Sequence, residues 1–250
     1  MKIKIVETSL NLRVERGRCK EDYLLSGAVA KKQLSFSDAD IYANVEFMDC
    51  DNADYLKMFE DSGYESYTSL DEKGRGILCE IKKEYEVKKI GEMADPHMLH
   101  LRVEKGNEYI DLITVRILVA GSNDADFKDR REQWNKVLRY IENLSDKSHL
   151  VLTGDFNHGV ISYAVNGYRH KPRQYFNYQM IVSDLESMSI VLYPMEGNSY
   201  RGYMKIDHIA TGEKISVETA VYNDVFGNTE IIGIPDHSCI VANIEVLKGD

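Results

Sequence analysis

The sequence predicts an α+β layered sandwich in a single domain that spans residues 1–250. Many short runs show apolar alternation or a high content of β-branched residues, which indicates strands, and few segments have helical spacing. The two kinds of element do not alternate regularly, as they would in a parallel-sheet fold. No proline-, glycine- or serine-rich linker divides the 250 residues, a length that suits one large domain with a buried core.

In chain order, alternation predicts strands at about 2–6, 39–47, 76–82, 84–90, 98–104, 108–119, 149–153, 190–193, 204–210, 215–222 and 239–246. The clearest helix is predicted over about 124–144, where apolar residues recur at helical spacing and charged residues fill the other faces. Weaker helical patterns lie near 19–33, 52–61 and 174–189. The predicted elements are thus mostly strands, with helices placed between groups of them.

Composition and net charge limit the classes of function that the sequence allows. The 31 basic and 41 acidic residues give a net charge of −10, which disfavours a general nucleic-acid binder because non-specific affinity comes from phosphate neutralisation. A bound divalent cation and a local basic patch can reverse that potential at a site. The four cysteines are scattered without CxxC spacing, and no apolar run reaches the roughly 20 residues of a membrane span. We therefore expect a reduced, cytoplasmic protein without membrane contact or an obligatory protein partner.

The most informative motif is Gly154-Asp155-Phe156-Asn157, directly after the apolar run 149–153. Asp155 and Asn157 are two residues apart, so both side chains project to the same side of the strand end. A carboxylate there can hold a hard cation or a water, and a carboxamide can donate to a phosphate oxygen. Taken alone, the motif is explained equally by a site that handles phosphates and by a simple turn, because turns also favour these residues.

Three further polar positions end strand-like runs. Glu46 closes the run 40–46 and suits Mg²⁺, which prefers one or two carboxylates together with water and substrate oxygens. His237, which follows Asp236, is a candidate for proton handling, and Asp207 could orient its imidazole. Together these residues are suited to metal-assisted phosphodiester hydrolysis.

In this order the motifs resemble the endonuclease/exonuclease/phosphatase superfamily, which includes DNase I-like nucleases, exonuclease III-type abasic-site endonucleases and inositol-polyphosphate phosphatases. The matching segments are 3–11 ending in Asn11, 40–46, 75–80, Arg130 to Gln133, 154–157, 206–208 and 236–237. The resemblance covers nearly the whole chain. It implies a four-layer α/β/β/α sandwich of two packed, mostly antiparallel sheets.

The resemblance also implies a role for each matched residue. Glu46 would bind Mg²⁺, with Mn²⁺ as a substitute, and Asp236 would lie beside the metal or the scissile group. Asp155 would activate or position the attacking water, and Asn157 would contact the phosphate. Asp207 would support His237, and Asn11 would hold the phosphate.

Arg116 departs from the family pattern. It stands in the run 108–119 where many members carry a histidine, and the abasic-site endonucleases a tyrosine, facing the phosphate. An arginine cannot act as a general acid at neutral pH, but its planar fork can clamp a phosphate and stabilise charge in the transition state. The alternative is an outward-facing strand residue. A second departure is Val45, where glutamine is usual.

The segment that follows the central motif gives a clue to the substrate. Arg169, Lys171 and Arg173 lie among tyrosines, a mixture suited to phosphates and bases, although a solvated loop explains it equally. Ser199 to Tyr203 could form another aromatic and cationic wall. Our first hypothesis is a Mg²⁺-dependent nuclease acting on DNA rather than RNA. The alternatives are a hydrolase of a small phosphorylated molecule, such as a phosphoinositide or nucleotide, and a catalytically weakened binding module.

Overall fold

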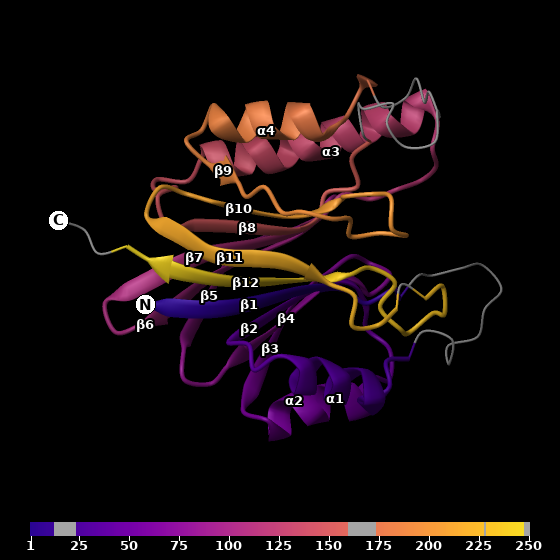
Figure 1. Ribbon diagram of the computed structural model, residues 1–250, viewed down its shortest axis with the longest axis vertical. Coiled ribbons are helices and arrows are strands. Elements are labelled where there is room, and N and C mark those ends of the chain that lie inside the picture. Colours follow the sequence, from indigo (N-terminus) through magenta and orange to yellow (C-terminus); the bar gives the residue numbers. More distant parts are fainter. Residues whose placement is uncertain (13–23, 160–173, 228, 248–250) are drawn as a thin grey trace.

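The computed structural model describes residues 1–12, 24–159, 174–227 and 229–247. Two six-stranded sheets lie face to face, and a pair of helices covers each outer face (Figure 1). The predicted α+β sandwich of four layers is therefore confirmed. Among the described residues, no helix is long and apolar enough to cross a bilayer.

The first sheet has the strand order β11-β12-β1-β2-β4-β3. Its strands are β1 (Lys2–Ser9), β2 (Ile41–Met48), β3 (Tyr64–Leu70), β4 (Arg75–Lys82), β11 (Ile215–Asn223) and β12 (Cys239–Val246). Helices α1 (Gly27–Phe36) and α2 (Ala53–Asp61) cover its outer face (Figure 1). Only β1 and β2 pair in parallel in this sheet, among the residues that the structure describes.

The second sheet has the order β5-β6-β7-β8-β10-β9. It comprises β5 (Glu86–Ala94), β6 (His97–Lys105), β7 (Glu108–Arg116), β8 (Leu150–Asp155), β9 (Val191–Leu192) and β10 (Asp207–Thr211). Helices α3 (Asp124–Glu142) and α4 (Tyr178–Glu186) lie on its outer face (Figure 1). Here β7 and β8 form the parallel pair, so the predicted antiparallel character holds for the other pairs.

Three apolar clusters hold the layers together, one between the sheets and one under each helix pair. Alternation divides the side chains of each strand between them: Ile3 and Ile5 of β1 enter the inter-sheet cluster, whereas Val6 packs under α1 and α2. Because both faces of the central strands are covered, all eight residues of β2 are buried. The predicted site residues of β2, β7, β8 and β10 lie near the ends of these strands.

Several predicted elements need correction. Strand β3 was not predicted, because most of its residues are polar and it lies at the sheet edge, where only Tyr64 and Ser69 are buried. The helix predicted at 19–33 is α1 at 27–36, which begins after the N-cap Ser26; residues 13–23 lie outside the described residues. The run 108–119 ends as a strand at Arg116, and the strand predicted at 204–210 begins at Asp207.

Candidate active site

The predicted site residues meet where the ends of neighbouring strands come together. In the second sheet Arg116 is paired with Asp155 across β7 and β8, and Asp155 with Asp207 across β8 and β10. Glu46 comes from β2 in the facing sheet, and His237 lies two residues before the start of β12. The carboxyl end of β1 lies on the side of the sandwich away from both chain termini (Figure 1).

Gly154 explains why the central motif has its sequence. Its φ is +133°, and a Cβ at this position would lie 2.0 Å from the Val115 carbonyl oxygen, so only glycine permits this approach of β8 to β7. Asn157 follows in the left-handed region at φ 45°, and its backbone N–H donates to Asp155 Oδ1 at 3.0 Å. The turn thereby fixes the direction of the Asp155 carboxylate.

The Asn157 side chain also acts on Asp155. Its Nδ2 donates to Asp155 Oδ2 at 2.5 Å and to the Ile117 carbonyl oxygen at 2.8 Å. Both amide hydrogens are thus directed at protein oxygens. This geometry makes Asn157 a residue that positions Asp155, and the predicted contact with phosphate stays a prediction.

Two side chains of α3 hold this turn and the preceding loop in place through hydrogen bonds. Arg130 donates from Nη1 to the Asn157 carbonyl oxygen and from Nη2 to that of Gly121, each at 2.6 Å. One turn along the helix, Gln133 accepts from the Leu118 backbone N–H at 2.7 Å and donates to its carbonyl oxygen at 3.1 Å. The Arg-x-x-Gln spacing of the sequence therefore has a physical meaning, since both residues hold the segment between β7 and α3 against the site.

His237 and Asp207 form a buried pair. The distance between His237 Nδ1 and Asp207 Oδ2 is 2.8 Å, and the Tyr200 ring centroid lies 4.6 Å from the imidazole centroid. Burial alone would lower the pKa of His237, but the charge and hydrogen bond of Asp207, with the charges of Asp155 and Asp236, raise it to about 10. The imidazole is therefore a cation at neutral pH, oriented by Asp207 as the sequence predicts.

Asp155 has the opposite character. Burial and the adjacent charge of Asp207 raise the pKa of Asp155 to about 7, against the lowering effect of the charges of His237 and Arg116. A carboxylate that exchanges its proton near neutral pH is suited to act as a general base.

Glu46 lies in a β-bulge of β2 with φ 57°, where its carboxylate turns toward the second sheet. Ser9 Oγ donates to Glu46 Oε2 at 3.1 Å, and the Arg116 guanidinium donates to Oε1. Arg116 Nε lies 3.9 Å from Asp155 Oδ2. Arg116 thus lies between the predicted metal ligand Glu46 and the predicted catalytic residue Asp155.

Asn11 has φ 56°, and its side chain holds a loop of the site. Nδ2 donates to the carbonyl oxygens of Ile231 and Ile234, at 2.9 and 3.1 Å. That loop leads directly to Asp236 and His237. Asn11 therefore ties the end of β1 to the segment that carries the imidazole, and its expected contact with the phosphate stays a prediction.

Two residues near the site were not predicted. Glu7 is fully buried, and neither of its carboxylate oxygens has a hydrogen-bond partner among the described residues. Burial and the charge of Asp207 raise its pKa well above the ordinary value. The available signal was alternation, because Glu7 occupies the same inward face of β1 as Ile3 and Ile5.

The second unpredicted residue, His97, is the first residue of β6 and is paired with Arg116 of the neighbouring strand β7. Its Nε2 lies 3.5 Å from Asp71 Oδ2. Burial, followed by the charge of Arg116, lowers its pKa to about 4. His97 is therefore neutral at physiological pH, and only the pairing register of β6 and β7 could have indicated that it adjoins the site.

The polar residues at this edge suit a hard divalent cation. Asp155, Asp207 and His237 each offer one ligand atom within 4.8 Å of the others, and Asp207 Oδ1 is buried with no hydrogen-bond partner among the described residues. Glu46 adds another carboxylate from the facing sheet. Carboxylate oxygens fit Mg²⁺ or Mn²⁺.

Three substrate-binding predictions remain. Arg169, Lys171 and Arg173 lie outside the described residues. Tyr178, which follows them, packs against the rings of His158 and His208, at centroid distances of 5.8 and 5.5 Å. That tyrosine therefore contributes to the protein interior.

No protein-family model and no curated protein matches the sequence. Solved structures do match over almost the whole chain. TDP2 of D. rerio, humanized by 14 mutations, is 13% identical, with a TM-score of 0.66 and coverage of 98% of this chain and 99% of that one. The endonuclease domain of TRAS1, a telomere-specific non-LTR retrotransposon, is 13% identical, with a TM-score of 0.64 and coverage of 99% and 100%.

An endonuclease/exonuclease/phosphatase from Bacteroides vulgatus is 14% identical, with a TM-score of 0.60 and coverage of 98% and 99%. The chain therefore has the DNase I-like fold of the endonuclease/exonuclease/phosphatase superfamily, which the order of its motifs predicted. At these identities the likeness describes the fold, and the residues at the strand ends must carry any argument about chemistry.

Proposed function

We propose that the protein is a divalent-metal-dependent phosphodiesterase, and specifically a nuclease that hydrolyses DNA. The observation that carries the proposal is the joining of Asp155, Asp207 and His237 within 4.8 Å at the ends of neighbouring strands. Their environments move the pKa of Asp155 up to about 7 and that of His237 up to about 10. A base and a cation are thereby provided in one site at neutral pH.

In this proposal Asp155 accepts the proton of the attacking water. The two hydrogen bonds from Asn157, through its backbone N–H and its Nδ2, hold both carboxylate oxygens in a fixed direction. The Arg130 contact with the Asn157 carbonyl oxygen restricts the turn further. A general base positioned in this way typically contributes about 10²–10⁴ in rate.

His237 stabilises the negative charge of the reacting phosphate and can give a proton to the leaving oxygen. Because Asp207 holds Nδ1, it is Nε2 that can face the substrate. Arg116 adds a second positive charge on the other side of Asp155. Both cations lie in a buried setting, where water screens a charge less than at the surface.

The metal of the proposal is Mg²⁺ or Mn²⁺, held by Glu46 with Asp236 close by. When bound, it would neutralise phosphate oxygens and stabilise the leaving oxygen. Glu46→Gln tests this ligand: we expect weaker Mg²⁺ binding and strongly reduced turnover with little change in folding. Near-normal activity across a Mg²⁺ titration would contradict it.

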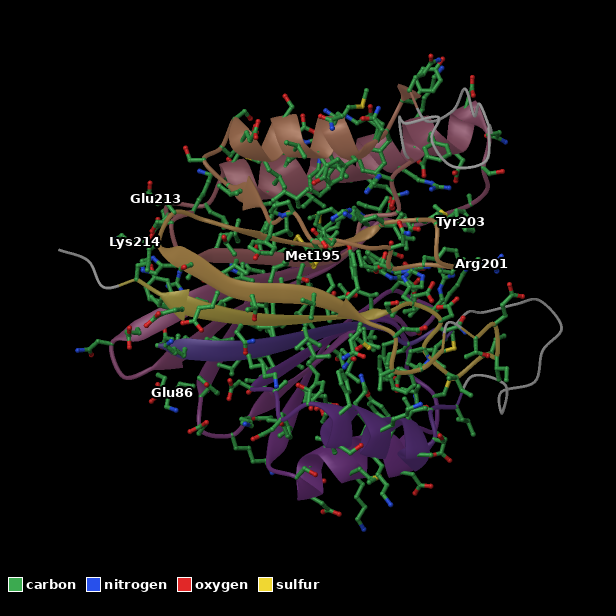
Figure 2. All side chains as sticks on the ribbon, viewed as in Figure 1. Glu86, Met195, Arg201, Tyr203, Glu213 and Lys214 are labelled. Atoms are coloured by element: carbon green, nitrogen blue, oxygen red, sulfur yellow. The ribbon has the colours of Figure 1, made fainter. Side chains whose placement is uncertain are left out.

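A polynucleotide substrate is favoured by the aromatic and cationic residues beside His237. The Tyr200 ring contacts the imidazole, and the Arg201 guanidinium lies 5.0 Å from the Tyr200 ring centroid. Arg201 and Tyr203 project at the edge opposite the Glu213–Lys214 turn (Figure 2). Stacking on such rings is worth about 1–3 kcal/mol per base. Among the matching structures, D. rerio TDP2 is complexed with a single-strand DNA product.

The basic residues Arg169, Lys171 and Arg173 belong to this proposal as phosphate contacts. Neutralising all three should weaken polynucleotide binding and reduce the slope of log affinity against log salt, because fewer phosphate contacts release fewer counterions. An unchanged slope would make this segment a solvated loop.

A small phosphorylated molecule is the second candidate substrate, because a net charge of −10 disfavours long polyanions. The deciding experiment is a Mg²⁺-dependent cleavage assay on supercoiled plasmid, single-stranded DNA and RNA. The site variant is Asp155→Ala, and the matched control is Asp95→Ala at an exposed position. Cleavage abolished by chelator and by Asp155→Ala alone supports the nuclease. Folded protein that cleaves none of them, yet releases phosphate from nucleotides or phosphoinositides, favours the second candidate.

A further inference from the structure

We propose that Arg116 competes with the divalent cation for Glu46 and thereby sets the metal affinity of the site. The inference rests on the proposed function, because it concerns the same metal. It starts from one contact: the Arg116 guanidinium donates to Glu46 Oε1, while Ser9 Oγ already occupies Oε2 at 3.1 Å. Both oxygens of the proposed ligand are therefore engaged by the protein itself.

The competition is direct because the two cations need the same carboxylate. A guanidinium remains charged at any physiological pH, so it does not yield Glu46 by losing a proton. The pair is shielded from water, with 18% of the Arg116 side chain and 7% of the Glu46 side chain exposed. In such a setting a divalent ion next to Arg116 is strongly repelled unless the guanidinium moves away.

Arg116 has an alternative partner when it leaves Glu46. Its Nε lies 3.9 Å from Asp155 Oδ2 and has no hydrogen bond among the described residues. Displacement therefore turns the guanidinium toward Asp155, where the reacting phosphate is proposed to lie. A histidine or tyrosine at this position would carry no permanent charge and could not compete in this way. Arg116 would thus couple metal entry to phosphate capture.

The position of the metal decides whether this competition exists. A cation held by Asp155, Asp207 and His237 alone would not require Glu46, and Arg116 would affect it only through general repulsion. A cation held by Glu46 must displace the guanidinium. Measuring how Arg116 affects metal affinity therefore also distinguishes the two arrangements.

The test is Mn²⁺ binding to the full chain without nucleic acid, followed by isothermal titration and by electron paramagnetic resonance of free Mn²⁺. Arg116→Gln should tighten binding on the order of tenfold or more, the scale expected when a close charge pair is uncoupled. Arg116→Lys should give a smaller gain, because a lysine keeps the charge and loses the fork. It also provides a second variant if Arg116→Gln does not fold.

Arg75→Gln is the matched control, since Arg75 is a nearby cation that pairs with Asp71 rather than with Glu46. It should change the Mn²⁺ affinity by less than about threefold, because a partly exposed charge is screened by solvent and salt. In a Glu46→Gln background the gain from Arg116→Gln should disappear, because the contested carboxylate is gone. Equal gains for Arg116→Gln and Arg75→Gln would overturn the inference, as would a gain that persists without Glu46.

The two proposals fail in different ways. The protein could bind Mn²⁺ and cleave DNA while Arg116→Gln leaves the metal affinity unchanged. That result would overturn the proposed competition and would not affect the proposed nuclease function. A protein that binds no Mn²⁺ in any variant and cleaves nothing overturns both.

Discussion

Replacing Glu7 with glutamine should stabilise the protein, increasingly so as the pH rises. Glu7 is fully buried without a hydrogen-bond partner among the described residues, and burial and the charge of Asp207 raise its pKa well above 4.5. A raised pKa contributes stability that is fully present below the unfolded value and is lost as the pH rises toward the folded value. Glutamine has nearly the same shape and no proton to lose, so the variant avoids this loss.

The magnitude follows from the proton count. While Glu7 keeps its proton in the native state, the variant gains about 1.4 kcal/mol in the free energy of unfolding for each pH unit above the ordinary value. At pH 6.5, two units above 4.5, the gain reaches at most about 3 kcal/mol, or roughly 6–12 °C in melting temperature for a chain of this size. At pH 4.5 the two proteins should have nearly the same free energy of unfolding. Because the introduced amide mimics the protonated carboxyl, DNA cleavage should be largely retained.

The assay is urea unfolding of both proteins at several pH values, with Glu80→Gln as a matched control. Glu80 is also buried, accepts a hydrogen bond from Ser66 Oγ at 2.7 Å, and has a pKa raised by burial to about 8. The stability advantage of Glu80→Gln should grow with the same slope up to about pH 8 and should then stay constant. A Glu7→Gln advantage that does not change with pH would refute the reasoning, because it would mean that Glu7 is already ionised in the folded protein.

Three further changes probe the chemistry of the site. Asp155→Asn should lower kcat by about 10²–10⁴, and kcat/KM of the unaltered protein should rise with pH up to about 7 as Asp155 loses its proton, as a pH–rate profile would show. Asp207→Asn should lower the pKa of His237 from about 10, as ring NMR would measure. The unaltered protein should lose stability as the pH rises from 6.5 to 10, and urea unfolding should show that the variant lacks much of this pH-dependent stability. Arg130→Lys should lower kcat at unchanged Mn²⁺ affinity, because a lysine has one nitrogen in place of the two separate donor nitrogens with which Arg130 bonds the carbonyl oxygens of Asn157 and Gly121. Arg131→Lys, whose arginine pairs with Asp184, should have little effect on single-turnover cleavage.

The fold was largely predictable because its layers depend on local pattern. Strand alternation and the helical spacing of 124–142 place the core residues. The strands β7 and β10, which pair with β8 on its two sides, fix the direction of the motif that contains Asp155. The edge strand β3 could not be predicted in this way, since a strand with one solvated side and many polar residues has no clear apolar pattern. Elements that depend on local spacing were found, and one that depends on its place in the sheet was not.

For the site, the sequence predicted which residues lie together better than it predicted which atoms they contact. Motif order brought Glu46, Asp155 and His237 into the same hypothesis, and the structure places their elements at one edge. The sequence could not show that Arg116 reaches across to Glu46, because that contact joins two sheets and depends on how they pack. Alternation places Glu7 on the same face as Ile3 and Ile5, but the extent of its burial depends on the facing sheet.

The charges at this edge also explain how similar groups acquire different tasks. Asp155 and Asp207 are adjacent across one strand pair, yet only Asp207 bonds directly to His237 at 2.8 Å. That bond keeps the imidazole cationic, and the charge of Asp207 in turn helps to raise the pKa of Asp155 toward neutrality. A single carboxylate therefore keeps the imidazole cationic and helps to raise the pKa of the proposed base. Asp207→Asn should consequently impair both functions at once, whereas Asp155→Asn should leave the hydrogen bond that orients His237 in place.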